Sequence, residues 1–200
     1  MSLASWFAIT LLATSPNPSA VEAKTATPPA FTTSSGGSNA PADTPRPKLA
    51  SGHRAPDFQY QSYDDLWQNL HNVLEHGDVL LVFGASDVDL RMLERERETL
   101  VKGGVMPLAV VEKTDRDVWA SVRRLGLTFS LMADPRGAIG TQYGVYDAGL
   151  GRSIGSWFMI DRKGKVRSSG IGMPSQSWLG LASNAFGRQF TGGTQNASTH

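Results

Sequence analysis

The segment VLLVFGASDVDLRMLE, residues 79–94, decides the fold. Its first five residues form a continuous apolar run, which is typical of a strand covered on both faces, as in a mostly parallel sheet. Ser86 and Asp89 then have the spacing of a helix amino-terminal cap. Leu90 and Leu93 begin the apolar stripe of an amphipathic helix. The segment therefore predicts a buried strand that leads directly into a helix.

Helix-like and strand-like patterns alternate on both sides of this segment, which predicts an α/β fold with a mixed central sheet flanked by helices. The expected elements are a helix from a cap at Ser62 to Gly77, the strand 79–83, a helix from Ser86 to Gly103, the strand 105–111, a helix from Thr114 to Gly126, a short helix from Asp134 to Tyr143, a hairpin of strands 157–160 and 165–168, and a last helix opened by Pro174. Four tryptophans occupy apolar positions in these elements, so we expect them in the core: Trp67, Trp119, Trp157 and Trp178.

The composition excludes several classes of function. The chain of 200 residues has no cysteine, which rules out a disulfide, a thiolate metal site, an iron–sulfur cluster and a cysteine nucleophile. Its net charge is +1, with 18% charged residues. This balance gives no electrostatic reason to expect nucleic acid or an anionic membrane as a partner.

The first fifty residues differ in kind from the rest. Leu3–Ala13 is an apolar run too short to span a bilayer, which needs about 20 residues. It suits a signal peptide over residues 1–23, so we expect export to the periplasm or the exterior and no stable membrane span. Met1-Ser2 supplies no basic residue, so a disordered N-terminus or an upstream start codon remains an alternative. Residues 24–51 are rich in Ser, Thr, Pro and Ala and predict a disordered linker. We expect one domain over 52–188 and a disordered tail over 189–200.

Five short segments of this domain carry a family likeness in the right order. They are GHRAPDF at 52–58, VLLVF at 79–83, FSLMAD at 129–134, YGV at 143–145, and FMID at 158–161 followed by GKV at 164–166. On these segments the domain resembles the redoxin group of the thioredoxin fold, and most of all the alkyl hydroperoxide reductase and thiol-specific antioxidant peroxiredoxins. The resemblance implies a thioredoxin-like fold.

The catalytic positions of that family do not match. Its members read T-x-x-C-x-x-E after the first buried strand, and the Glu fits Glu94 here. This frame places Val88 at the Thr and Arg91 at the cysteine. The family's arginine falls at Gly155 or its neighbours; Arg152 is three residues away. An Arg side chain cannot attack a peroxide, so the resemblance implies a degenerate site without thiol chemistry.

The sequence therefore predicts a binding or structural module of the redoxin class, with no catalytic residue, cofactor or metal assigned. The expected contact surface is the former active-site segment, formed by Ser86, Asp87, Val88, Asp89, Arg91 and Glu94. The partner is an unknown protein or a small ligand. One alternative is an oxidoreductase that works with a partner's thiol. Another is a ligand binder that uses Arg91 for a carboxylate or phosphate.

Two further clusters have a structural and a functional interpretation. Asp87, Asp89 and Glu94 are capping residues or, alternatively, oxygen ligands of a metal ion. Arg162, Lys163, Lys165 and Arg167 surround a hairpin turn. We interpret them as a solvated strand edge that discourages pairing, with an anion site as the alternative. His71 and His76 are five residues apart on a predicted helix, which does not favour a shared metal site.

Overall fold

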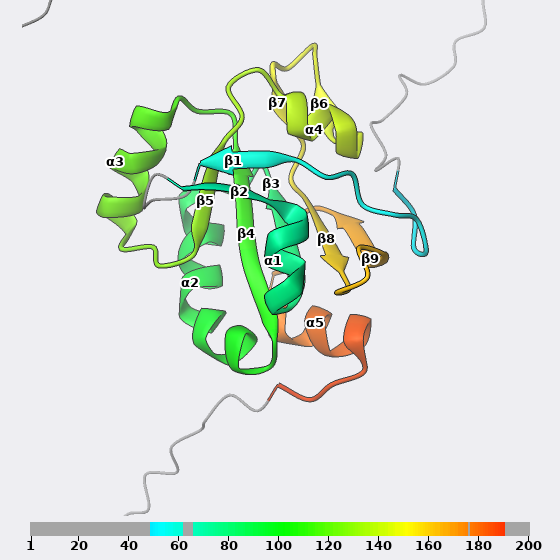
Figure 1. Cartoon of the computed structure of the whole chain (residues 1–200). Coiled ribbons are helices and arrows are strands. Elements are labelled where there is room, and N and C mark those ends of the chain that lie inside the picture. Colours follow the sequence, from blue (N-terminus) through cyan, green and yellow to red (C-terminus); the bar gives the residue numbers. More distant parts are fainter. Residues whose placement is uncertain (1–48, 62–65, 176, 191–200) are drawn as a thin grey trace, which may run out of the picture. The chain divides into compact units, whose positions relative to one another are not determined.

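The computed structural model describes residues 49–61, 66–175 and 177–190 (Figure 1). The predicted signal peptide, most of the predicted linker and most of the predicted tail lie outside these residues. The elements are β1 Gln59–Gln61, β2 Trp67–Asn69, α1 Leu70–His76, β3 Asp78–Phe83, α2 Asp87–Lys102, β4 Val105–Val111, α3 Asp115–Leu125, β5 Ser130–Ala133, α4 Ala138–Tyr143, β6 Tyr146–Asp147, β7 Arg152–Ser153, β8 Ser156–Ile160, β9 Val166–Ile171 and α5 Trp178–Phe186.

The central sheet has five strands in the order β5-β4-β3-β8-β9. β3, β4 and β5 are parallel, whereas β8 runs antiparallel to β3, and β9 runs antiparallel to β8. The expected mixed α/β sheet is confirmed. Its central strand β3 is buried along its whole length, as the apolar run at 79–83 predicts.

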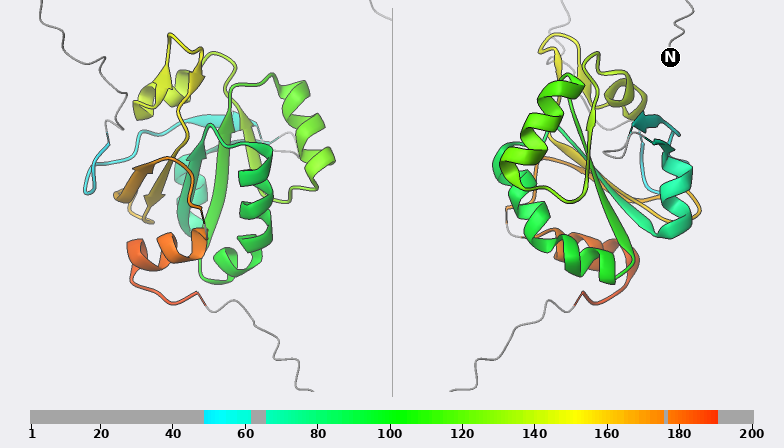
Figure 2. Two further views of the ribbon diagram at one scale, coloured as in Figure 1. Left: turned by 180° about the vertical axis from the view of Figure 1, so that it is seen from behind. Right: turned by 60° about the vertical axis from the view of Figure 1, so that its left-hand side comes forward.

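The sheet separates two apolar clusters, and side chains of β3 alternate between them. Val79, Leu81 and Phe83 pack with residues of α1 and α4. Leu80 and Val82 pack instead with residues of α2, α3 and α5. Figure 2 (right) shows α1 and α2 on opposite sides of the sheet. The domain therefore has helices on both faces, as the α/β pattern requires.

Helix α1 is shorter than predicted. The predicted cap at Ser62 lies outside the described residues, and residues 67–69 form β2 because they pair with β1. Asn69 then caps the helix by accepting a hydrogen bond from the Asn72 amide at 2.7 Å. Leu66 is exposed and does not extend the buried stripe. Cross-strand pairing with β1 thus overrides the helical periodicity here.

Other predicted boundaries also need correction. The short helix α4 begins at Ala138, because Asp134 caps it from outside by accepting hydrogen bonds from the Ala138 and Gly140 amides. The last helix, α5, begins after Ser177 and not at Pro174. Strand β5 was not predicted. Its four residues are too few to show a periodic pattern, and its position depends on β4.

The tryptophans are not all in the core. Trp178 is fully buried, and Trp119 and Trp157 are partly buried. Trp67, in contrast, is 71% exposed, so the prediction for that residue is wrong. The reason is the same hairpin: Trp67 pairs with Gln61 in β1 instead of lying on a helix that faces the sheet.

Both ends of the described chain pack on the domain. Leu49, placed in the predicted linker, packs against the core, and its carbonyl accepts a hydrogen bond from Ser169. Phe190, placed in the predicted tail, packs against the α2 side of the sheet. No helix within the described ranges is both long and apolar enough to cross a membrane.

Candidate functional site: the amino end of helix α2

A tight turn connects β3 to α2. Gly84 has a φ of +61°. A Cβ there would lie 2.7 Å from the Ser153 carbonyl oxygen and 3.1 Å from the Gly155 nitrogen. Only glycine combines this positive φ with such a close approach of the neighbouring backbone, because it has no Cβ. The loop before β8 therefore lies against the start of α2, and Gly155 stands where the resemblance places the family's arginine.

Ser86 and Asp89 cap helix α2, as predicted. The Ser86 hydroxyl and amide donate to Asp89 Oδ2 at 2.6 and 2.8 Å, and the Asp89 amide donates to Ser86 Oγ at 3.4 Å. This capping box satisfies orphan amides of the first turn. The Ser86 hydroxyl and Asp89 Oδ2 are thus engaged with each other, and these residues stabilise the turn.

Asp87 is bound to a different helix. Its Oδ2 lies 2.7 Å from Nη1 of Arg124, on the last turn of α3. The Arg124 hydrogen bond lowers the pKa of Asp87. Slight burial opposes this effect, and the positive charges of Arg124, Lys113 and Arg91 reinforce it. The ion pair connects the amino end of α2 to the carboxyl end of α3.

Val88 and Arg91 are left facing solvent. The Val88 side chain is 72% exposed, which is unusual for a large apolar residue in a helix that buries Leu90 and Leu93. Arg91 is also exposed. It makes no hydrogen bond or ion pair with any residue that the structure describes. These two side chains are the chemically available groups of the first turns of α2.

Glu94 is engaged elsewhere. Its carboxylate accepts hydrogen bonds from the Thr128 amide at 2.8 Å and from the Thr128 hydroxyl at 2.6 Å, and Arg97 Nε lies 3.4 Å from it. Glu94 thus fastens α2 to the loop before β5. It belongs to the same helix as Arg91 but does not bind to it.

The predicted site residues therefore divide into three groups. Ser86 and Asp89 bind each other, whereas Asp87 and Glu94 bind Arg124 and Thr128. Val88 and Arg91 are solvent-facing. The sequence did not point to Arg124 or Thr128 as partners, because both contacts join segments far apart in the chain. Arg123 and Arg124 are adjacent in the sequence. The position of Arg124 beside Asp87 depends, however, on how α3 packs.

This arrangement has limited chemical capability. The three carboxylates considered as metal ligands bind three different partners, and no group of three His, Asp or Glu side chains in the described chain is placed to hold a metal ion. The Ser86 hydroxyl donates to a capping carboxylate instead of facing a base. With no cysteine in the sequence, the turn cannot supply a thiolate of its own.

The profile of the AhpC/TSA family matches residues 51–169, which include this turn and most of the sheet. The chain belongs to the AhpC/TSA family. Alkyl hydroperoxide reductase E of Mycobacterium tuberculosis is 26% identical over 138 residues, which is 64% of this chain and 89% of the relative. The protein of the same name from Mycobacterium bovis matches to the same extent. The resemblance drawn from the short motifs is confirmed.

Solved structures share the fold. Peroxidoxin BcpB from Mycobacterium tuberculosis aligns with a TM-score of 0.57 and 17% identity, over 62% of this chain and 86% of that one. Reduced 2-Cys peroxiredoxin from Plasmodium vivax also gives 0.57, with 18% identity over 68% and 93% of the two chains. A thiol:disulfide interchange protein from Chlorobium tepidum, described as a putative DsbE, gives 0.53, with 23% identity over 64% and 89%. The thioredoxin-like fold is thereby established for this AhpC/TSA chain.

Proposed function

We propose that this AhpC/TSA chain is a non-catalytic binding protein, and that it contacts a protein partner through Val88 and Arg91 of α2. The single observation that carries the proposal is the state of this turn: every carboxylate on it is engaged within the domain, while an apolar side chain and a cation stand free beside each other. Arginine next to exposed apolar area is typical of protein contact surfaces.

The absence of thiol chemistry supports the same proposal. Reduction of a peroxide by this fold requires a thiolate that can be oxidised to a sulfenic acid. Arg91 stands at the corresponding position and has no such chemistry. The fold does not need the cysteine, because its stability comes from apolar packing on both faces of the sheet.

The complementary partner surface has an acidic group opposite Arg91 and an apolar side chain opposite Val88. Removal of the Arg91 charge would then weaken binding, and an acidic side chain at that position would repel the partner. The alternative, an oxidoreductase that uses a partner's thiol, would place that thiol at the same turn.

Photo-cross-linking at Val88 tests the contact. A photoreactive residue at Val88 in the full chain should yield a specific adduct in extract of the native organism. The Arg91→Glu variant should lose the adduct, whereas Arg95→Glu should keep it. Arg95 is exposed on the same helix and makes no hydrogen bond or ion pair with the residues that the structure describes, so the control makes the same charge change. Equal adduct with Arg91→Glu and Arg95→Glu contradicts the proposal.

We further propose that the chain is exported, on the strength of the apolar run Leu3–Ala13 and the small residues at 21–23. Sequencing of the amino terminus of the protein isolated from its native cells tests this proposal. The expected mature terminus is Lys24. A full-length protein that still begins at Met1 and fractionates with the cytosol contradicts it.

A further inference from the structure

A pocket of about 400 Å³ lies at the other end of the sheet from the α2 turn. It is formed by α1, the chain before β1, and the turn between β8 and β9. That turn follows Ile160, which pairs with Val79 near the start of β3, whereas α2 begins beyond the end of β3. The pocket is therefore separate from the candidate site described above.

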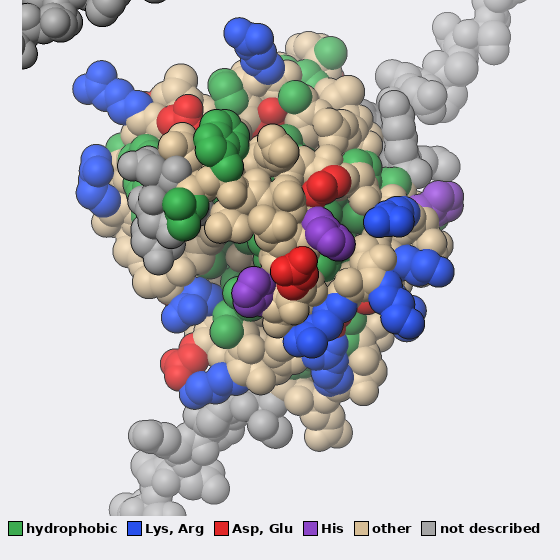
Figure 3. Space-filling view, in the orientation of Figure 1, with side chains coloured by type: hydrophobic (Ala, Val, Ile, Leu, Met, Phe, Trp, Pro, Cys, Tyr) green, Lys and Arg blue, Asp and Glu red, His purple; other side chains and the backbone are tan. Residues whose placement is uncertain are grey.

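The lining of this pocket is cationic. It contains three permanent cations, Arg54, Arg162 and Lys163, and one carboxylate, Asp57, which leaves a net charge of +2. The whole chain has a net charge of only +1, so positive charge is concentrated here. Figure 3 shows basic side chains gathered at the lower right, near α1 and the β8–β9 turn.

Backbone hydrogen bonds position the segments that carry these cations. The Ala55 amide donates to the Gly164 carbonyl at 2.8 Å, and the Val166 amide donates to the His53 carbonyl at 2.9 Å. These two bonds hold Arg54 beside the turn. The Lys163 amide donates to Asp161 Oδ1 at 2.9 Å, which fixes the turn itself. Arg54 and Lys163 thus come to one pocket from distant parts of the sequence.

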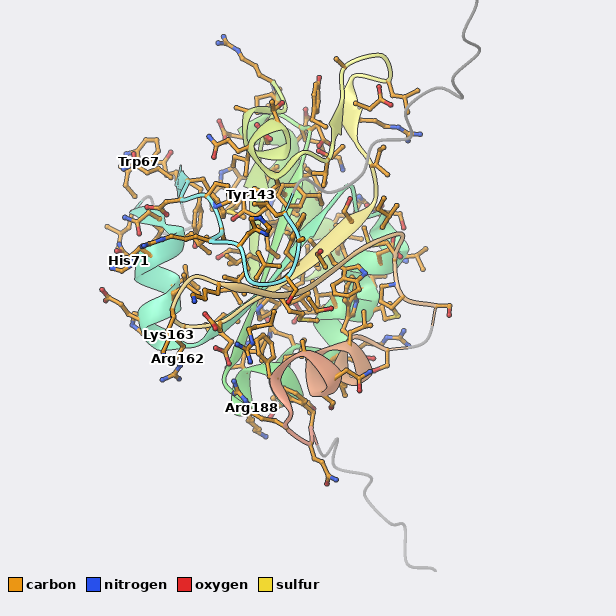
Figure 4. The ribbon with its side chains drawn as sticks, turned by 90° about the vertical axis from the view of Figure 1, so that its right-hand side faces the viewer. Trp67, His71, Tyr143, Arg162, Lys163 and Arg188 are labelled. Atoms are coloured by element: carbon orange, nitrogen blue, oxygen red, sulfur yellow. The ribbon has the colours of Figure 1, made fainter. Side chains whose placement is uncertain are left out.

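The charged groups of this lining are largely available. Within the described residues, the side chains of Arg54 and Lys163 make no hydrogen bond or ion pair. Arg162 uses Nη2 to donate to the His76 carbonyl at 3.1 Å, and a guanidinium has further N–H groups. In the single carboxylate, Asp57, Oδ1 accepts hydrogen bonds from the amides of Phe58 and His71. Figure 4 shows His71, Lys163 and Arg162 on the same side of the molecule, next to α1.

The floor of the pocket is apolar. Ala55, Leu70 and Leu74 line it, and all three are buried. An anion bound by the cations would therefore have apolar surface beside it. Such a site fits a ligand with a doubly charged head and an uncharged body.

We propose that this pocket binds the phosphate group of a small molecule, with the phosphate between Arg54, Arg162 and Lys163 and the organic part on Leu70 and Leu74. Arginine forks match the tetrahedral oxygens of a phosphate, and lysine adds a point charge. A dianion also neutralises the charge of the lining. The β8–β9 turn, with Arg162 and Lys163, would then form an anion site in addition to a solvated strand edge.

Titration of the full-length protein by NMR tests the proposal, with phenyl phosphate and inorganic phosphate as probes. Amides at 53–55, 71 and 162–164 should shift in a saturable way at millimolar ligand. Lys163→Gln and Arg54→Gln should each raise the dissociation constant about three- to tenfold, since each removes a charge-assisted contact at a solvent-accessible site. The double variant should show no saturation.

Arg116→Gln is the matched control for Arg54→Gln. Arg116 lies in the first turn of α3, which follows the carboxyl end of β4; it is exposed and does not line the pocket, so the variant removes the same charge outside the site. Its dissociation constant should stay within about twofold of the wild-type value, because a distant charge is screened by salt. An equal loss in Arg116→Gln, or no saturable shift with either probe, overturns the phosphate site. Equal affinity for the two probes overturns the role of the apolar floor.

Discussion

Asp87 on the first turn of α2 and Arg124 on the last turn of α3 form an ion pair with 2.7 Å between Oδ2 and Nη1. The pair lies at the amino end of α2, where the family motif expects a cysteine and this chain has Arg91. The neighbouring Ser86 and Asp89 are engaged with each other, whereas Val88 and Arg91 face solvent.

The ion pair makes stability depend on pH in the acid range. Because the pKa of Asp87 is lowered in the folded state, its contribution is present above the ordinary Asp pKa of about 3.9 and is lost as the pH falls through the folded value. Asp87→Asn should therefore be less stable than wild type at pH 7. The difference should shrink below about pH 4. Urea unfolding at both pH values measures it, and a difference that grows on acidification contradicts the assignment.

The capping box predicts a stability effect of Ser86. Ser86→Ala should lower the free energy of unfolding by about 1 kcal/mol, because the Asp89 amide loses its acceptor. Thr114→Ala removes the equivalent cap of α3 and should cost a similar amount. Neither variant should affect the photo-adduct at Val88. If Ser86→Ala keeps its stability but loses the adduct, Ser86 is a contact residue and not a cap.

Glu94 is predicted to stabilise the fold by connecting α2 to the loop before β5. Glu94→Ala should lower the free energy of unfolding by about 1–3 kcal/mol, because the Thr128 amide and hydroxyl lose a charged acceptor. Hydrogen exchange of the Thr128 amide should become faster. Glu98→Ala is the control on the same helix, since Glu98 forms an ion pair with the exposed Lys102 and does not contact the loop before β5 in the described structure. Unchanged exchange at Thr128 in the Glu94 variant would show that the loop is held by other contacts.

Tyr143 links the core to the segment before β1. It is fully buried, its hydroxyl donates to the Pro56 carbonyl at 2.9 Å, and burial raises its pKa, with a further contribution from the charge of Asp57. Tyr143→Phe should cost about 1–2 kcal/mol because the Pro56 carbonyl loses its donor. Since the folded pKa is raised, stability should fall as the pH rises above about 10, the ordinary Tyr value. Absorbance of tyrosinate during an alkaline titration checks this: in wild type a step of tyrosinate formation should coincide with unfolding, and that step should be smaller in the Tyr143→Phe variant.

Local signals made part of the fold predictable. The apolar run at 79–83 and the Ser86–Asp89 spacing predict β3 and α2 correctly, because both elements are specified by residues within a few positions of each other. The Thr114 cap and Gly126 likewise bound α3 as predicted. The five short motifs identified the family without any knowledge of the contacts.

Other features depend on contacts between distant segments. Residues 67–69 form β2 only because β1 lies beside them, and Trp67 becomes exposed as a result. The sequence proposed residues for the candidate site, but it did not indicate their partners in the fold. Nothing near Asp87 or Glu94 in the sequence indicates that Arg124 and Thr128 bind them. The sequence also does not indicate that Arg54 lies beside Arg162 and Lys163 in one pocket, because more than a hundred residues separate Arg54 from them.

Peroxide consumption by the purified full-length chain tests the central claim most directly. The assay compares hydrogen peroxide loss with a dithiol donor in the presence and in the absence of the protein. The account predicts equal rates, because the chain has no thiol and the family motif places Arg91 where a cysteine is expected. A protein-dependent rate that saturates with peroxide and disappears in the Arg91→Ala variant would contradict it.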